Sequence, residues 1–288
     1  MTLLSTYETQ VADLLHDPNH VQWSVSQLDN YINAARLKLV MDTGCLRTLQ
    51  ETYCTLGTEQ YQFGQVTGAN IVNGGTGYTA PTATFGADPL GSGTGAAATL
   101  TVSNGVITAI TFTSFGSNYV GVPPITISDS TGTGASIVAG VINVNTYDVL
   151  GINIVWGAYR YALEWRAWSN FSAQMRGYTT LTRQPVMWAV YGNTAIFVGP
   201  LPDQTYPMEV DSIIQPTALA NYTTNDPIPP IAQDPIKFYA AYLAKFYDQS
   251  YGEAETFLQQ YEQRVREVDS AYTRRIPSIY QGIVDTRG

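Results

Sequence analysis

The sequence predicts an α+β fold in which a discontinuous antiparallel helical bundle with a small β-hairpin element is interrupted by an all-β insertion domain. Three observations lead to this prediction. No lysine or arginine occurs between Arg47 and Arg160, whereas both flanks are charged. Inside that gap a Gly/Thr-rich pattern occurs twice, about 40 residues apart, which is typical of stacked or duplicated β units. Both flanks carry apolar residues at helical spacing.

Two helices are expected in the first flank. Apolar residues recur at helical spacing over residues 5–16, and Pro18 ends this segment. The second helix begins near Ser24, because Ser24 and Gln27 fit a capping box, and it ends before Gly44. A strand-like stretch follows over residues 49–63 and is clearest over 57–63.

The Gly/Thr-rich pattern repeats the same features in the same order. They are Gly75-Thr-Gly-Tyr78, Pro81, Gly93-Thr-Gly95-Ala96 and a Thr/Val/Ile run, which return as Gly116-Ser-Asn-Tyr119, Pro123, Gly132-Thr-Gly134-Ala135 and a second run. Apolar residues alternate with threonines on both sides of Asn104-Gly105, which predicts a hairpin with a type I′ turn. The Gly-Thr-Gly elements are most simply turns or bulges that need positive φ.

The second flank mixes strands with helices. We expect a strand over residues 149–156, an amphipathic helix over 164–175, a hairpin over 185–198 that turns at Gly192-Asn193, and a strand over 207–214. Two helices close the chain, over 235–250 and 253–272, separated at Gly252. Pro235 suits the first turn of a helix that Asp234 caps.

These elements predict four segments. Residues 1–66 are the first part of the helical core, and 67–146 are the inserted all-β repeat domain. Residues 147–272 are the second part of the core, with its hairpin and closing helices, and 273–288 are an extended C-terminal arm. An insertion of this size is tolerated if its two ends lie close together.

Composition narrows the function classes. The chain has 288 residues, of which 44% are hydrophobic, so it can bury a sizeable core. Only 13% of residues are charged, and 20 are tyrosines, which suits a surface that contacts other proteins. The net charge of −9 argues against tight sequence-independent phosphate binding, but it is compatible with a passage through which DNA slides. Neither a secretion signal nor an apolar run of about 18 residues is visible, so we expect a soluble protein made in the cytoplasm.

No residue pattern predicts catalysis, a cofactor or a metal. His16 and His20 flank Asp17, but Pro18 breaks the helix that an i, i+4 ligand pair needs, so a solvated helix end is favoured. Cys45 and Cys54 are expected to be reduced structural thiols. The segment Gly91-Ser-Gly-Thr-Gly95 is not followed by the lysine and the helix that a phosphate-binding loop needs. The carboxylates available for a glycosidase pair, Glu51, Glu59, Asp148 and Glu164, read as ordinary surface residues.

The order of several weak motifs resembles the head-to-tail adaptor proteins of tailed bacteriophages. The resemblance covers residues 1–66 and 147–288, whereas 67–146 resemble Gly/Tyr/Pro/Thr-rich β repeats of phage and bacterial surface proteins. The motifs are Ala34-Ala-Arg-Leu-Lys38, Asp42-Thr-Gly-Cys-Leu-Arg47, Gly57-Thr-Glu-Gln-Tyr61, Asp148-Val-Leu-Gly-Ile152, Arg160 with Leu163, residues 185–191, Phe197-Val-Gly-Pro-Leu-Pro-Asp203, residues 206–210 and the two closing helices.

The resemblance implies a non-enzymatic structural protein of the virion neck. It would form a homo-oligomeric ring, commonly a dodecamer, between the portal protein and a tail or nozzle protein, and DNA would pass through without specific binding. No membrane is involved. The insertion would face outward toward tail fibres, capsid or another insertion, with Tyr78, Phe85, Phe115 and Tyr119 as contacts. Interface candidates on the core and the arm are Trp165, Trp168, Arg264, Arg266, Arg274, Arg275 and Tyr280.

Three other functions stay open. The first is a glycan-binding module in which the same four aromatic residues, Tyr78, Phe85, Phe115 and Tyr119, stack on sugars. The second is a different virion surface or tail protein. The third is a cell-wall hydrolase, which would need two carboxylates facing each other across a sugar.

Overall fold

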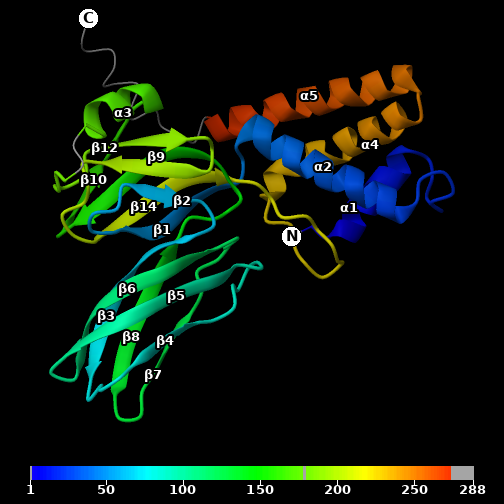
Figure 1. Cartoon of the computed structure of the whole chain (residues 1–288). Coiled ribbons are helices and arrows are strands. Elements are labelled where there is room, and N and C mark those ends of the chain that lie inside the picture. Colours follow the sequence, from blue (N-terminus) through cyan, green and yellow to red (C-terminus); the bar gives the residue numbers. More distant parts are fainter. Residues whose placement is uncertain (1, 178–179, 274–288) are drawn as a thin grey trace, which may run out of the picture. The chain divides into compact units, whose positions relative to one another are not determined.

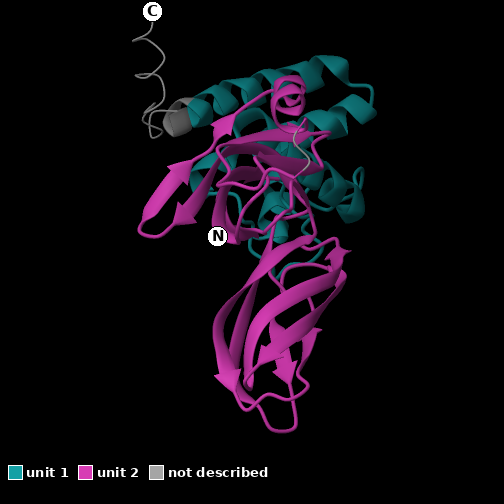
Figure 2. Cartoon of the chain, turned by 60° about the vertical axis from the view of Figure 1, so that its left-hand side comes forward, with its two compact units in different colours: residues 1–46, 215–288 teal, residues 47–214 magenta. Residues whose placement is uncertain are grey.

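The computed structural model describes residues 2–177 and 180–273, and it divides the chain into two compact units. One unit comprises residues 1–46 and 215–288, and the other comprises residues 47–214 (Figure 2). The first is helical and the second is almost entirely β (Figure 1). Each unit is described by itself below.

The expected fold class, a helical bundle with a small β element, is wrong. Strands hold 37% of the described residues and helices hold 28%. The difference arises because the segments on both sides of the repeats form two four-stranded sheets of their own. Several of those strands are only two to five residues long, and two of the strands, β1 and β2, pair with partners that are distant in the sequence, β14 and β13.

The helical unit joins the two ends of the chain. It contains α1 (Leu4–Leu14), α2 (Val25–Thr43), the 3₁₀ turn η1 (Pro230–Ala232), α4 (Asp234–Tyr247) and α5 (Tyr251–Thr273). Helices α4 and α5 form a hairpin, and α4 packs on both α1 and α2. The core between them is lined by fully buried apolar side chains from each end of the chain, among them Val11, Ile32, Leu39, Ile236 and Ala240.

The predicted ends of the helices are largely confirmed. Ser24 and Gln27 form the capping box at the start of α2. Gly44 ends that helix with φ +60°, a conformation that glycine adopts without a steric penalty. Pro235 lies in the first turn of α4, but the predicted cap is wrong: Gln233 is the N-cap residue, and Asp234 is the first residue of the helix. Gly252, however, lies inside α5 rather than between the two closing helices.

The part of the β unit outside the repeats contains two four-stranded sheets. The first sheet is antiparallel, in the order β1 (Arg47–Cys54), β14 (Tyr206–Ile214), β9 (Thr146–Trp156) and β10 (Tyr159–Ala162). The second has the order β11 (Glu164–Trp165), β12 (Met187–Tyr191), β13 (Ala195–Gly199) and β2 (Gln60–Gln62). Both sheets contribute to one apolar core, which includes Ile152, Ile154, Trp188, Val198 and Val210.

The helix expected over residues 164–175 begins later than predicted. Glu164 and Trp165 form β11, a short strand parallel to β12, and helix α3 covers only Trp168–Met175. The backbone N–H groups of Glu164 and Arg166 donate to the carbonyls of Val186 and Trp188, both at 2.9 Å. Pairing with the edge of a sheet therefore overrides the amphipathic helical pattern at these residues.

The two repeats form six strands that pair in twos. They are β3 (Val66–Thr76), β4 (Thr82–Phe85), β5 (Thr94–Ser103), β6 (Val106–Ser117), β7 (Ile125–Ser128) and β8 (Thr133–Val141), with pairs β3–β8, β4–β7 and β5–β6. The predicted β5–β6 hairpin is confirmed, because Asn104 and Gly105 both have positive φ. Strand β1 packs on β3 and β8, so residues 47–214 form one compact unit. A separate domain at 67–146 stays a prediction.

The repeats interlock through their tyrosines. Tyr78 of the first repeat accepts the N–H of Ala135 in the second at 3.1 Å, and Tyr119 of the second accepts the N–H of Ala96 in the first at 3.4 Å. The rings cover Gly132 and Gly93, where an added Cβ would lie within 2.4 Å of a ring atom. The Gly-Thr-Gly elements at 93–95 and 132–134 therefore each pack against the tyrosine of the other repeat.

Two aspartates add a second reciprocal link. They are Asp88 in the first repeat and Asp129 in the second, and backbone N–H groups, first those of Thr131 and Thr79, lower the pKa of Asp129. Each of the two carboxylates accepts two consecutive backbone N–H groups that directly follow the tyrosine of the other repeat. Asp88 accepts those of Val120 (2.7 Å) and Gly121 (2.9 Å), and Asp129 accepts those of Thr79 and Ala80 (both 2.9 Å).

Candidate interaction surfaces and their buried support

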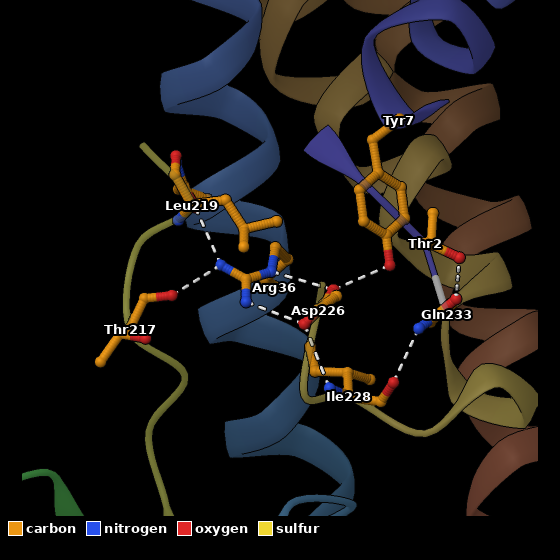
Figure 3. A network of polar contacts seen from close by, with 9 residues as sticks. Thr2, Tyr7, Arg36, Thr217, Leu219, Asp226, Ile228 and Gln233 are labelled. Atoms are coloured by element: carbon orange, nitrogen blue, oxygen red, sulfur yellow. Dashed lines mark hydrogen bonds and ion pairs between the residues drawn. The ribbon is translucent and has the colours of Figure 1, made fainter. Parts of the chain in front are cut away.

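A buried ion pair lies at the centre of the helical unit (Figure 3). Arg36 of α2 donates from Nε and Nη2 to the two carboxylate oxygens of Asp226, at 3.1 and 2.8 Å. The exposed fractions of the two side chains are 1% and 0%. The two-pronged geometry matches the planar guanidinium to the carboxylate, which gives a strong and directional contact.

The remaining polar atoms of this pair are also occupied. Arg36 Nη1 donates to the carbonyl of Thr217 and to the side chain of Asn33, both at 2.9 Å. The hydroxyl of Tyr7 donates to Asp226 at 2.8 Å, and burial followed by the Asp226 charge raises the pKa of Tyr7. The network therefore ties α1 and α2 to the segment before α4 (Figure 3).

A second buried pair consists of two acids. Glu8 of α1 is buried and Asp29 of α2 is half-buried. Among the described residues, nothing donates to Glu8 Oε1 or to Asp29 Oδ1. Burial, and after it a hydrogen bond with Asp29 and the Asp29 charge, raise the pKa of Glu8 to about 7, with a partial offset from a hydrogen bond with Tyr222. A proton shared between the two carboxyl groups satisfies both oxygens.

This pair predicts a loss of stability between acidic and neutral pH. A folded-state pKa above the ordinary 4.5 means that the folded chain keeps a proton that the unfolded chain releases, so stability falls as pH rises from about 4.5 to 7. Glu8→Gln should remove this fall and raise the free energy of unfolding at pH 8 by on the order of 1–2 kcal/mol. Urea unfolding at pH 5 and pH 8 measures it. Asp13→Asn, an exposed change on α1, is the control, and an unchanged pH dependence in Glu8→Gln would refute the shared proton.

An exposed aromatic hairpin lies at the edge of the first sheet. Trp156, Tyr159 and Tyr161 expose 50%, 69% and 39% of their surface. Tyr161 contacts the other two rings, with ring centroids 6.0 and 6.3 Å apart. Gly157, with φ +60°, makes the turn between β9 and β10. Strand β10 pairs only with β9 in the described residues, so its outer edge presents free backbone groups beside these rings.

A family model for the SU10 adaptor protein matches residues 1–282. The chain belongs to the SU10 adaptor protein family. It is therefore a phage adaptor, a structural protein of the virion. The match runs through both compact units, including the repeats. A comparison with curated proteins found no match to the chain.

The two tryptophans predicted as interface anchors of this SU10 adaptor differ in their surroundings. Trp165 is 60% exposed on β11. Trp168 packs on Phe197 and Tyr191, with ring centroids 4.6 and 4.7 Å apart, and the guanidinium of Arg176 lies over its ring. Trp165 therefore has an open face, whereas Trp168 stabilises the contact between α3 and the second sheet.

The predicted basic contacts of the adaptor lie on α5 and beyond it. Arg264 forms ion pairs with Asp234 and Glu267, both at 3.5 Å. Arg266 is exposed on the same helix. The other three candidates, Arg274, Arg275 and Tyr280, lie outside the described residues, as does most of the predicted arm over 273–288.

The four aromatic residues predicted as outer contacts of the repeats separate into two groups. Tyr78 and Tyr119 are buried, with 5% and 1% exposure, and they hold the repeats together. Phe85 is half-buried against Phe112, whereas Phe115 is 42% exposed. The two tyrosines of the aromatic hairpin, Tyr159 and Tyr161, were not predicted as surface contacts, although a tryptophan and two tyrosines around Gly157 and Arg160 were a visible signal.

The acid and the two cysteines considered above as possible metal or reactive groups lie in ordinary structural environments. Asp17 accepts backbone N–H groups from residues 21–23, and that of Trp23 contributes most to lowering its pKa. In the described residues, no group of three or more His, Cys, Asp or Glu side chains could hold a metal ion. Cys45 and Cys54 are free and buried, and burial raises the pKa of the Cys54 thiol to about 12. No described helix has the length and apolar character needed to cross a membrane.

Proposed function

We propose that this adaptor assembles as an oligomeric ring, commonly a dodecamer, between the portal protein and a tail or nozzle protein, in the neck of the virion. The observation that carries the proposal is the family match over residues 1–282, which runs through both compact units and the repeats. The net charge of −9 supports an axial passage that DNA traverses without being held, since tight phosphate binding needs clustered basic residues.

The aromatic hairpin is the surface best suited to contact a neighbouring subunit in the ring. Tryptophan and tyrosine dominate protein interfaces, and an open strand edge offers backbone groups for pairing across them. Trp165, Arg264 and Arg266 are further candidates for the ring or portal contact, together with Trp168, Arg274, Arg275 and Tyr280. The repeats, as a lobe over 67–146, would face tail fibres, capsid or a neighbouring lobe.

Analytical ultracentrifugation tests the proposal. The chain mixed with purified portal protein should sediment as a complex of much higher mass than either component. A chain that stays monomeric and ignores the portal at micromolar concentration would contradict it.

A double variant tests the hairpin. Trp156→Ala with Tyr159→Ala should shift the sedimenting species toward the monomer, because truncating a central interface aromatic costs about 2 kcal/mol or more. Circular dichroism should stay unchanged, since neither side chain belongs to the core. Val21→Ala, a truncation of an 86% exposed apolar side chain, is the control and should assemble as wild type. Normal assembly by the double variant would place the subunit contact elsewhere.

A further inference from the structure

A groove of about 600 Å³ is lined by β3 and β6 of the repeats, by the end of β1 and the residues after it, and by the start of β14 and Thr205 before it. All of its lining belongs to the β unit. The volume is within the range of small-ligand sites. None of the lining residues carries a charge: they are aromatic, aliphatic, hydroxyl-bearing or amide side chains. Nothing in the proposed adaptor function explains such a site.

The aromatic part of the groove is a pair of stacked phenylalanine rings that the core of the repeats holds in place. Phe112 and Phe115 are stacked, with ring centroids 5.6 Å apart and planes inclined by 19°. Phe112 also contacts Phe85, at 5.9 Å between centroids, so the stack is anchored in the core of the repeats. Phe115 is the outer member, with 42% of its surface exposed. Its ring can receive a flat ligand without rearrangement of the core.

The polar part of the groove consists of groups that both donate and accept hydrogen bonds. Asn70, Thr111 and Thr205 are exposed lining residues from three separate strands or loops. A threonine hydroxyl has one donor and two acceptor positions, and an asparagine amide has two of each. Such groups match a ligand that is itself covered in hydroxyls, and they offer nothing to neutralise a charged one.

We propose that this groove binds a neutral saccharide, with one sugar ring stacked on Phe115 and its hydroxyls bonded to Asn70 and Thr111. The C–H bonds on one face of a pyranose are weakly positive, and the face of an aromatic ring is negative, so the two attract. Acidic glycans and nucleic acids are disfavoured, because the lining holds no lysine or arginine.

An added β-strand from another protein fits the groove less well. In the described residues β3 pairs only with β8 and β6 only with β5, so each has one edge without a hydrogen-bonded strand, although β3 and β6 pack on each other. Both strands are irregular there: the register shifts between Ile71 and Asn73 in β3, and β6 has an extra residue between Phe112 and Ser114. Bulges of this kind interrupt the regular row of backbone groups that strand addition needs.

Saturation-transfer NMR on the full chain tests the proposal. The probes are three neutral oligosaccharides, maltohexaose, cellohexaose and chitohexaose, and one acidic oligosaccharide, hexagalacturonic acid. At least one neutral probe should receive saturation, and the acidic probe should not. Phe115→Ala should raise the dissociation constant about tenfold, which is the affinity that one good aromatic contact contributes. Asn70→Ala should raise it several-fold. Both residues are exposed, so both variants should fold.

Leu90→Ala, an exposed change in the repeats outside the groove, is the matched control and should bind as wild type. Absence of transfer to every neutral probe at about 10 mM, where even a millimolar site is mostly filled, overturns the proposal. Equal binding by Phe115→Ala also overturns it. If Phe115→Ala instead changes the sedimenting mass of the chain alone, the groove receives a protein strand and not a sugar. None of these outcomes depends on portal binding, so the adaptor function and the saccharide site fail separately.

Discussion

Replacing Asp226 by alanine is expected to destabilise the helical unit by about 3–5 kcal/mol, the typical cost of leaving one member of a buried ion pair without its partner. Arg36 would then keep a full charge at 1% exposure, with only neutral oxygens around it. Urea unfolding followed by far-ultraviolet circular dichroism measures the change. Hydrogen exchange should show faster opening in α1, α2 and α4 together, because the network joins both ends of the chain.

Two comparisons separate the ion pair from general damage to the core. Lys38→Ala removes an exposed ion pair with Asp42 on the same helix as Arg36, and it should cost less than about 1 kcal/mol. Arg36→Met combined with Asp226→Leu removes both charges, and it should cost clearly less than Asp226→Ala alone. A double variant as unstable as the single one would show that the charges are not what stabilises this contact.

The second large effect is expected at the glycines beneath the repeat tyrosines. Gly132→Ala places a methyl group 2.1 Å from the nearest atom of the Tyr78 ring, and Gly93→Ala places one 2.4 Å from the Tyr119 ring. Both changes should cost about 2–3 kcal/mol by overpacking. Neither glycine has positive φ, so the loss of stability comes from the clash with the tyrosine ring and not from backbone strain. Thermal unfolding of the two variants measures it.

The control for these variants is Gly151→Ala. Its added Cβ has no atom within 4 Å, and its φ is ordinary, so the change should be close to neutral. The two glycine variants should also have similar effects on stability, because each glycine packs in the same way against the tyrosine of the other repeat. A full effect in one variant with none in the other would contradict the reciprocal exchange.

The sequence predicted the regular elements better than it predicted their partners. The capping box at Ser24 and the turns at Asn104-Gly105 and Gly192-Asn193 depend on residues next to one another, so local chemistry was enough. The duplication was also visible. The sequence did not show which repeat each tyrosine packs against. The same motifs are compatible with a tyrosine that packs within its own repeat and with one that packs against the other repeat.

The fold class was misjudged for a related reason. Strand β1 has a mostly polar sequence with no clear alternation, and it exists because eight of its residues pair with β14, which lies far along the chain. Strand β2 depends in the same way on β13, which lies more than 100 residues further along the chain, and β11 depends on β12. Arg36 and Asp226 are 190 residues apart, so nothing local indicated their contact. Exposure, which separates Phe115 from Tyr78 and Tyr119, likewise follows from the tertiary fold.

The adaptor function is tested most directly in the phage that carries this gene, by electron microscopy of the particles made when the gene is interrupted. We expect capsids and tails that stay separate, and joined virions when the wild-type chain is supplied in trans. Virions with tails attached normally in the absence of the chain would contradict the proposed role between portal and tail.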